Sequence, residues 1–148
     1  MRVSPIRCAF SALLLLASAT AQAANLGNVL KSPGIMSSGQ VMYSRNKIFE
    51  LTIRPFGVLC IERIVGTEKH VVWAAGGGGT SLEPVYNLEM QKDGNLCLYE
   101  MKPSKRLIWQ SDSPRIIDNP FMILQDDGNL CVYGSWRGRQ GTLWCRFR

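Results

Sequence analysis

The chain has 148 residues, of which 46% are hydrophobic, and a formal net charge of +6. This length suits a single domain with one core. The basic residues are scattered, with short dense spots such as Arg137-x-Arg139 and Arg146-x-Arg148, so nucleic acid is not expected as a partner.

The first 23 residues have the features of a signal peptide. Arg2 and Arg7 precede an apolar run, and Ala21-Gln22-Ala23 matches the small-x-small pattern of a cleavage site. The apolar run is about a dozen residues, short of the roughly 20 that span a bilayer, so no membrane span is expected. We predict cleavage near Ala23 and a secreted or periplasmic protein of residues 24–148. Removing two of the 17 basic residues leaves 15 against 11 acidic ones, a net charge of +4.

An internal repeat organises the rest of the chain. Trp73, Trp109 and Trp144 lie 36 and then 35 residues apart, by subtraction of their numbers. A Leu-Cys dipeptide recurs in step with them, at Leu59-Cys60, Leu96-Cys97 and Leu130-Cys131. The pattern predicts three structural units of similar length.

Each unit is predicted to consist of β-strands. In Leu88 to Met90 and Met122 to Leu124, inward apolar positions alternate with polar or outward ones, as in half-buried strands. Asp93-Gly94 and Asp127-Gly128 supply tight turns. Glycines and prolines interrupt the chain at the junctions, and no sustained helical period is present. We therefore predict an all-β fold, with Leu98 opposite Trp109 on the buried side.

One polar pattern follows the same strand in two of the units. It consists of Gln91, Asp93, Asn95, Cys97 and Tyr99, and again of Gln125, Asp127, Asn129, Cys131 and Tyr133. Alternate side chains of a strand share a face, so each set can lie on one surface. Amide, carboxylate and phenol groups together match the donors and acceptors of sugar hydroxyls. A single copy would be compatible with an ordinary hairpin turn, but two copies at identical spacing favour a carbohydrate site.

Such a site would be open and weak, with affinity around millimolar, because each net hydrogen bond contributes only about 1 kcal/mol. No Cys-x-x-Cys pair is present to hold zinc, so no metal and no cofactor are expected. Four cysteines remain after processing, and an exported protein can join them in disulfides.

With these motifs the chain resembles the monocot mannose-binding lectins, also called bulb-type or B-lectins, whose repeated motif is Gln-x-Asp-x-Asn-x-Val-x-Tyr. The resemblance covers about residues 25–144. It implies a β-prism II fold of three four-stranded antiparallel sheets with pseudo-threefold symmetry and the tryptophans stacked at its centre. The lectin domain would be residues 24–148, with repeats at about 34–80, 81–114 and 115–148.

The resemblance also implies ligand roles on mannose-containing glycans. Asp93 and Asn95 would bind the axial 2-hydroxyl of mannose, Gln91 the 3-hydroxyl and Tyr99 the 4-hydroxyl. The second motif would repeat these contacts with Asp127, Asn129, Gln125 and Tyr133.

Three features depart from the family motif. Cysteine stands in the valine place in both motifs, where it can pack against a sugar ring as a small apolar residue. The first repeat has lost the pattern, since Arg54, Phe56, Val58 and Glu62 stand at the four polar places. Pairing Val132 opposite Trp144 puts Cys131 opposite Cys145, where a disulfide is geometrically allowed. The first motif is therefore the safer site.

Two other functions compete with sugar binding. Catalysis is not expected, because the single histidine, His70, has no evident partner and Asp93 and Asp127 lie in separate units. The stronger alternative is a protein-binding module on a lectin scaffold, such as an envelope component, an inhibitor or a lectin-like antibacterial protein, and exposed Trp136 would suit either use. By the resemblance, exchange of the carboxyl-terminal strand Thr142 to Cys145 is a candidate route to a homodimer.

Overall fold

The computed structural model describes residues 24–147, so the predicted signal peptide lies outside the described residues. Three antiparallel sheets of four strands each make up this part of the chain, with one short 3-10 turn, η1 (Pro55–Gly57). One sheet contains β3 (Met42–Tyr43), β4 (Phe49–Arg54), β5 (Val58–Val65) and β6 (Glu68–Gly76). The next contains β2 (Gly34–Ser37), β7 (Tyr86–Met90), β8 (Leu96–Glu100) and β9 (Arg106–Gln110). The last contains β1 (Val29–Lys31), β10 (Asp118–Leu124), β11 (Leu130–Trp136) and β12 (Arg139–Cys145).

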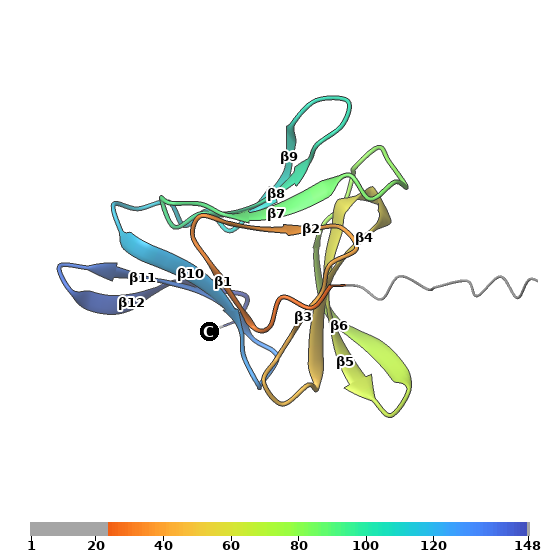
Figure 1. Cartoon of the computed structure of the whole chain (residues 1–148), viewed down its shortest axis with the longest axis horizontal. Coiled ribbons are helices and arrows are strands. Elements are labelled where there is room, and N and C mark those ends of the chain that lie inside the picture. Colours follow the sequence, from red (N-terminus) through yellow and green to blue (C-terminus); the bar gives the residue numbers. More distant parts are fainter. Residues whose placement is uncertain (1–23, 148) are drawn as a thin grey trace, which may run out of the picture.

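The three sheets form the sides of a triangular prism (Figure 1). Each sheet presents one apolar face to the interior, and none has enough area to bury that face alone. The all-β fold and the β-prism II architecture predicted from the sequence are confirmed. None of the helical segments within residues 24–147 has the length and apolarity needed to cross a membrane.

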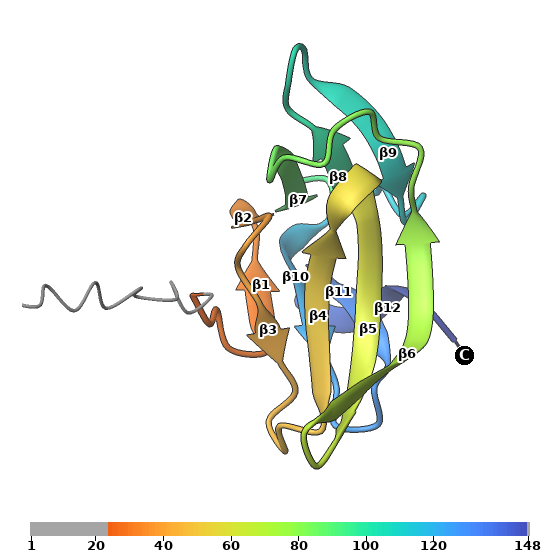
Figure 2. The ribbon, with the colours of Figure 1, turned by 90° about the vertical axis from the view of Figure 1, so that its right-hand side faces the viewer.

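The amino-terminal segment supplies one strand to every sheet. β1 pairs with β10, β2 with β7 and β3 with β4, so residues 29–43 touch all three sides of the prism. Figure 2 shows these three strands together at one side of the molecule, opposite β6, β9 and β12. The repeat ranges expected from the sequence did not anticipate this shared segment.

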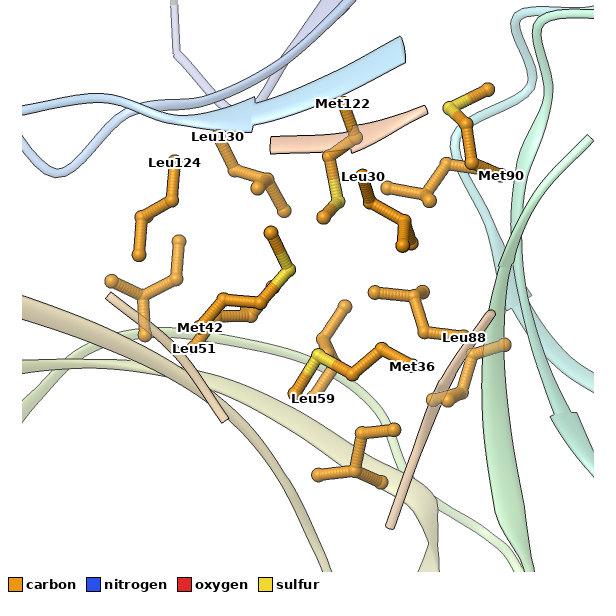
Figure 3. Packing of buried hydrophobic residues seen from close by; sticks show 14 of the residues in the cluster. Leu30, Met36, Met42, Leu51, Leu59, Leu88, Met90, Met122, Leu124 and Leu130 are labelled. Atoms are coloured by element: carbon orange, nitrogen blue, oxygen red, sulfur yellow. The ribbon is translucent and has the colours of Figure 1, made fainter. Parts of the chain in front are cut away.

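Methionine and leucine fill the centre, where the three sheets converge. Four fully buried methionines come from four different strands (Figure 3). They are Met36, Met42, Met90 and Met122. Unbranched, flexible methionine fits the irregular space between three inclined sheets better than a branched side chain. The leucines between them complete a single core shared by all three sheets.

The repeated tryptophans meet at one end of the prism. The ring centroid of Trp109 lies 5.9 Å from that of Trp73 and 5.5 Å from that of Trp144, and the third pair is 6.3 Å apart. The rings are steeply inclined, as aromatic pairs prefer. Leu98 lies opposite Trp109, as predicted. The tryptophan spacing in the sequence thus corresponds to one residue per sheet in a common cluster.

The turn of each polar motif abuts a neighbouring sheet. A β-carbon on Gly94 would lie 2.6 Å from Leu143 of β12, and one on Gly128 would lie 2.6 Å from the Phe49 ring of β4. Both glycines also have φ of 81°, which disfavours other residues. The glycine in each motif therefore serves two purposes, the hairpin conformation and the close approach that holds the hairpin in place.

Glu100 of β8 ties the loop after β6 to its sheet. This buried carboxylate accepts hydrogen bonds from Arg106 Nη2 at 2.7 Å and from Thr80 N at 2.7 Å, and Tyr86 Oη donates to it at 3.2 Å. Arg106, followed by the Thr80 amide, lowers the pKa of Glu100 from 4.5 to about 2.

The lowered pKa of Glu100 predicts a specific acid sensitivity. A carboxyl group whose pKa is depressed on folding contributes stability above its unfolded pKa of 4.5, and this stability is lost as the pH falls towards 2. We expect Glu100→Gln to reduce the free energy of unfolding at pH 7 and to flatten its decline between pH 4.5 and 2. Urea unfolding at a series of pH values measures both effects. Exposed Glu83→Gln is the control, and an identical pH slope in wild type and Glu100→Gln would contradict the prediction.

Candidate functional site

The two polar motifs adopt the same hairpin geometry. In the first, Gln91 Nε2 donates to Tyr99 Oη at 2.8 Å, and Asn95 N donates to Asp93 Oδ1 at 2.9 Å. The second copy has the same two bonds, each at 2.8 Å. The main chain closes both turns, since Gln91 N donates to the Asn95 carbonyl and Gln125 N to the Asn129 carbonyl. The structure therefore brings the motif side chains together on one hairpin in each of two sheets.

The asparagine of the first motif is held by its neighbours. Asn95 is 6% exposed, and its Oδ1 accepts from Ser111 Oγ at 3.1 Å and from Ser113 N at 3.2 Å. Its Nδ2 donates to Gln110 Oε1 at 3.0 Å, and Gln110 Nε2 donates in turn to Asp112 Oδ1 at 2.6 Å. This network fixes the orientation of the Asn95 amide before any ligand arrives.

The asparagine of the second motif is fixed by main-chain groups instead. Asn129 Nδ2 donates to the Phe147 carbonyl at 2.9 Å, and Phe147 N donates to Asn129 Oδ1 at 3.3 Å. The motif lines a pocket of about 560 Å³ together with residues of β12 and the carboxyl-terminal segment. Beyond the motif residues Gln125, Asn129, Cys131 and Tyr133, its lining is Thr142, Leu143, Trp144, Cys145 and Phe147. The second motif thus faces an apolar wall that includes Leu143, Trp144 and Phe147.

The two motif cysteines differ in chemistry. Cys97 is a buried free thiol, and burial raises its pKa, so it stays protonated at neutral pH and behaves as a small apolar residue. Cys131 forms a disulfide with Cys145, and the two lie opposite each other in β11 and β12. The bond predicted from the strand pairing is present. A disulfide therefore lines the second site at the valine place of the family motif.

The first sheet retains the turn but not the polar pattern. Arg54 and Glu62 occupy the places of Gln91 and Tyr99, and they form an ion pair across the same span of eight residues. Gly57 keeps the positive φ of Gly94, at 67°. An ion pair has replaced the amide-to-phenol hydrogen bond on this face, and Glu62 is buried beneath the guanidinium group.

The motif tyrosines have different surroundings. Lys105 Nζ lies 4.1 Å from the centre of the Tyr99 ring and is paired with Glu89 at 2.9 Å. The Tyr133 ring instead stacks on Phe121 at 5.6 Å. Burial is the main cause that raises the pKa of Tyr99, so its hydroxyl remains a donor at neutral pH.

Metal binding and a catalytic role of His70 have little support in the described residues. No group of three or more His, Cys, Asp or Glu side chains in residues 24–147 is arranged to hold a metal ion. His70 is an exposed residue of β6, with Glu68 at 3.3 Å.

Sequence reasoning missed the side chains that orient the motif asparagines. Gln110 lies opposite Cys97, which follows directly from placing Leu98 opposite Trp109, so the predicted register already contained this signal. Phe147 lies beyond the last strand, where no pattern pointed to it. The Arg54 and Glu62 pair could have been found from the spacing of eight residues alone.

No protein-family model matches the sequence. No curated protein matches it either. Solved structures do match. The mannose-specific agglutinin of snowdrop (Galanthus nivalis) bulbs, solved with methyl-α-D-mannoside, is 32% identical; the match covers 74% of this chain and 92% of that lectin, with a TM-score of 0.59. A monomeric monocot mannose-binding lectin from Gastrodia elata is 26% identical, with 81% and 95% covered and a TM-score of 0.64.

The lectin of Polygonatum cyrtonema, solved with a monomannoside, is 25% identical over 74% of this chain and 91% of that one, with a TM-score of 0.61. These structural neighbours are lectins. The match to the snowdrop agglutinin extends over almost all of that protein, and both share the prism of three sheets. The chain therefore belongs to the family of monocot mannose-binding, or bulb-type, lectins.

Proposed function

We propose that the chain is an exported carbohydrate-binding lectin that holds mannose-type glycans at two sites without a metal ion or cofactor. The observation that carries this proposal is the identical hydrogen bonding of two hairpins in different sheets. The mannoside complexes of the snowdrop and Polygonatum lectins support mannose as the sugar.

The internal bonds of the first site leave a defined set of groups for a ligand. Gln91 Nε2 donates to Tyr99 Oη, which leaves the Gln91 Oε1 acceptor and the Tyr99 hydroxyl proton. Asp93 uses Oδ1 within the turn, which leaves Oδ2, and Asn95 retains one N–H. Gln91 Nε2 also keeps its second N–H, so three donors and two acceptors remain. Because each sugar hydroxyl both donates and accepts, this set can bind adjacent hydroxyls of a hexose.

The roles implied by the family motif agree with this inventory. Asp93 and Asn95 would share the axial 2-hydroxyl, one accepting and the other donating. Gln91 would accept from the 3-hydroxyl and Tyr99 would donate to the 4-hydroxyl. Cys97 would lie beneath the ring carbons, where its protonated thiol offers an apolar surface.

We propose the same roles for Gln125, Asp127, Asn129 and Tyr133 in the second site. There the Cys131 to Cys145 disulfide takes the place of a free side chain at the floor. The exposed Phe147 ring adds apolar surface to the wall of this site. Two sites on one chain raise avidity for clustered glycans even where each site is weak.

Retention on immobilised mannan tests the proposal. Wild type is expected to be retained and then eluted by free methyl mannoside. Asp93→Ala and Asp127→Ala are each expected to weaken retention, and the double variant to abolish it, because each removes the free carboxylate oxygen. Asp118→Ala, at an exposed residue of β10 outside both motifs, is the matched control. Equal retention of the double variant, or no retention of wild type, would refute sugar binding through these motifs.

Export after cleavage near Ala23 is the second part of the proposal. The Cys131 to Cys145 disulfide supports it, because structural disulfides persist in oxidising compartments. Mass spectrometry of the protein recovered outside the cytoplasm is expected to give the mass of residues 24–148. This mass should be lower than that of the reduced chain by two hydrogen atoms, because one disulfide has formed. A mass that includes residues 1–23 would contradict the cleavage.

The expected homodimer remains a prediction. In the structure β12 pairs with β11 of its own chain, and the disulfide joins the same two strands. Exchange of β12 between two chains would require this bond to open or to form between chains. We therefore expect any exchanged dimer to be linked covalently or to appear only under reducing conditions, which light scattering with and without reductant would distinguish.

A further inference from the structure

A groove between the segment that follows β9 and the hairpin of β11 and β12 lies outside both polar motifs. Its volume is about 790 Å³, within the usual range for ligand pockets. One wall is the segment 114–117 between β9 and β10, and the other is the inner face of the β11 and β12 hairpin. Ile117 packs directly on Gly134 at its base, since any side chain at Gly134 would overlap Ile117.

The groove combines unpaired positive charge with exposed apolar surface. Arg115 and Arg139 line its two walls, and no carboxylate of residues 24–147 forms an ion pair with either. No aspartate or glutamate is among the lining residues. By contrast, Arg54 and Arg106 on the other sheets are paired with glutamates. Two unpaired guanidinium groups facing one groove favour an anionic occupant.

The groove also has exposed apolar side chains on both walls. Trp136 is 56% exposed at the end of β11, and Arg137 stacks on its ring at 4.5 Å. Ile116 is 94% exposed on the opposite wall. Gln140 and Thr142 add uncharged hydrogen-bonding groups along β12. An indole beside hydrogen-bonding side chains can contact the C–H face of a sugar ring while its hydroxyls are satisfied.

The groove also adjoins the second lectin site. Thr142 and Leu143 of β12 line both hollows. β12 is the edge strand of its sheet, so no further strand separates the two hollows at that edge. A glycan seated at Gln125 to Tyr133 could extend around the edge into the groove.

We propose that this groove binds an acidic saccharide, a sugar chain that carries carboxylates, with Arg115 and Arg139 holding the carboxylates and Trp136 a ring face. The two unpaired arginines favour an anionic ligand whatever the function of the motifs. The choice of a saccharide over an acidic peptide rests on the proposed lectin function. The groove would then recognise glycans that combine neutral mannose-type units with uronic acid units.

Titration with an oligogalacturonate hexamer, with its fully methyl-esterified form as the neutral counterpart, tests the proposal. The free acid is expected to bind and the ester to bind at least tenfold more weakly, because charge-assisted hydrogen bonds to arginine are lost. Arg115→Ala, Arg139→Ala and Trp136→Ala are each expected to weaken binding of the acid by about tenfold. Arg139→Lys should restore part of the loss, since lysine keeps the charge but not the bidentate geometry.

The control is Arg63→Ala, at an exposed arginine of β5 that also lacks an ion-pair partner among the described residues and lies outside the groove. Equal weakening by Arg63→Ala would show nonspecific attraction and overturn the proposal, as would equal binding of acid and ester. If a glutamate hexapeptide binds more tightly than the oligogalacturonate, the ligand of the groove is an acidic peptide and the saccharide proposal is overturned. Asp93→Ala with Asp127→Ala should abolish mannan retention and leave oligogalacturonate binding unchanged, which separates failure of this site from failure of the lectin sites.

Discussion

Replacing Leu98 with alanine is expected to lower the free energy of unfolding by about 3 kcal/mol. Leu98 of β8 has no exposed surface and lies opposite Trp109, between the tryptophan cluster and the methionine-rich centre. Removing three carbons there loses their transfer energy and leaves a cavity that three rigidly connected sheets cannot collapse to fill. Chemical unfolding followed by tryptophan fluorescence would measure the change.

Leu82 provides a matched control for this substitution. It lies in the loop before β7 and is 69% exposed. Leu82→Ala is expected to change stability by no more than about 0.5 kcal/mol, as is usual for exposed positions. Equal effects of the two substitutions would show that the shared core is not the main source of stability.

Loss of the Cys131 to Cys145 disulfide is expected to lower the free energy of unfolding by about 3 kcal/mol. The bond closes a loop with a sequence separation of 14, and cross-links of that length restrict the unfolded chain by about this amount. Unfolding with and without reductant measures the effect in wild type. Cys131→Ala with Cys145→Ala should match reduced wild type and should not respond to reductant.

Two outcomes would contradict this account of the disulfide. One is an unchanged unfolding midpoint in the double variant, and the other is an equal effect of reductant on wild type and the variant. The free cysteines, Cys60 and Cys97, are buried and serve as an internal control, because they are already thiols and reductant does not alter them. The first lectin site, in a different sheet, should retain its ligand after reduction.

Much of the strand pairing could be predicted from the sequence. Tryptophan and Leu-Cys spacing revealed three units, and one assumed pair in each of two units fixed the register. Leu98 opposite Trp109 and Val132 opposite Trp144 are both present in the structure. The reason is physical: side chains alternate along a strand, so one correct pair determines which residues face the core as far as the register is unbroken. In both hairpins the register shifts directly after that pair, between Leu98 and Tyr99 and between Val132 and Tyr133, and no sequence pattern signalled this shift.

The amino-terminal strands could not be predicted in the same way. β1, β2 and β3 have three, four and two residues, too few for an alternating pattern to stand out. The partners of β1 and β2, which are β10 and β7, lie far along the chain, so no local turn signal connects them. Only the tertiary arrangement, in which each sheet needs a fourth strand, assigns them.

Among the contacts of the candidate site, those within one hairpin could be predicted from the sequence, whereas those between distant segments could not. The Gln91 to Tyr99 contact lies within one hairpin and follows from the motif. The bonds from Ser111 and Ser113 to Asn95 join segments 16 and 18 residues apart across a strand pair. Such contacts depend on how the chain leaves β9, where the irregular run after Gln110 carries no periodic signal. Sequence patterns therefore located the motif side chains but not the residues that orient them.

The distribution of β1, β2 and β3 among the three sheets has a consequence for the order in which the protein can fold. These strands are synthesised before their main partners, yet β1 must wait for β10, which ends at Leu124. Every sheet remains incomplete on one edge until residues 29–43 are placed, so the prism closes only when nearly the whole chain is present. Contacts of such long sequence separation form slowly. A chain built in this way therefore completes its prism only as a finished unit, after most of its residues have been synthesised.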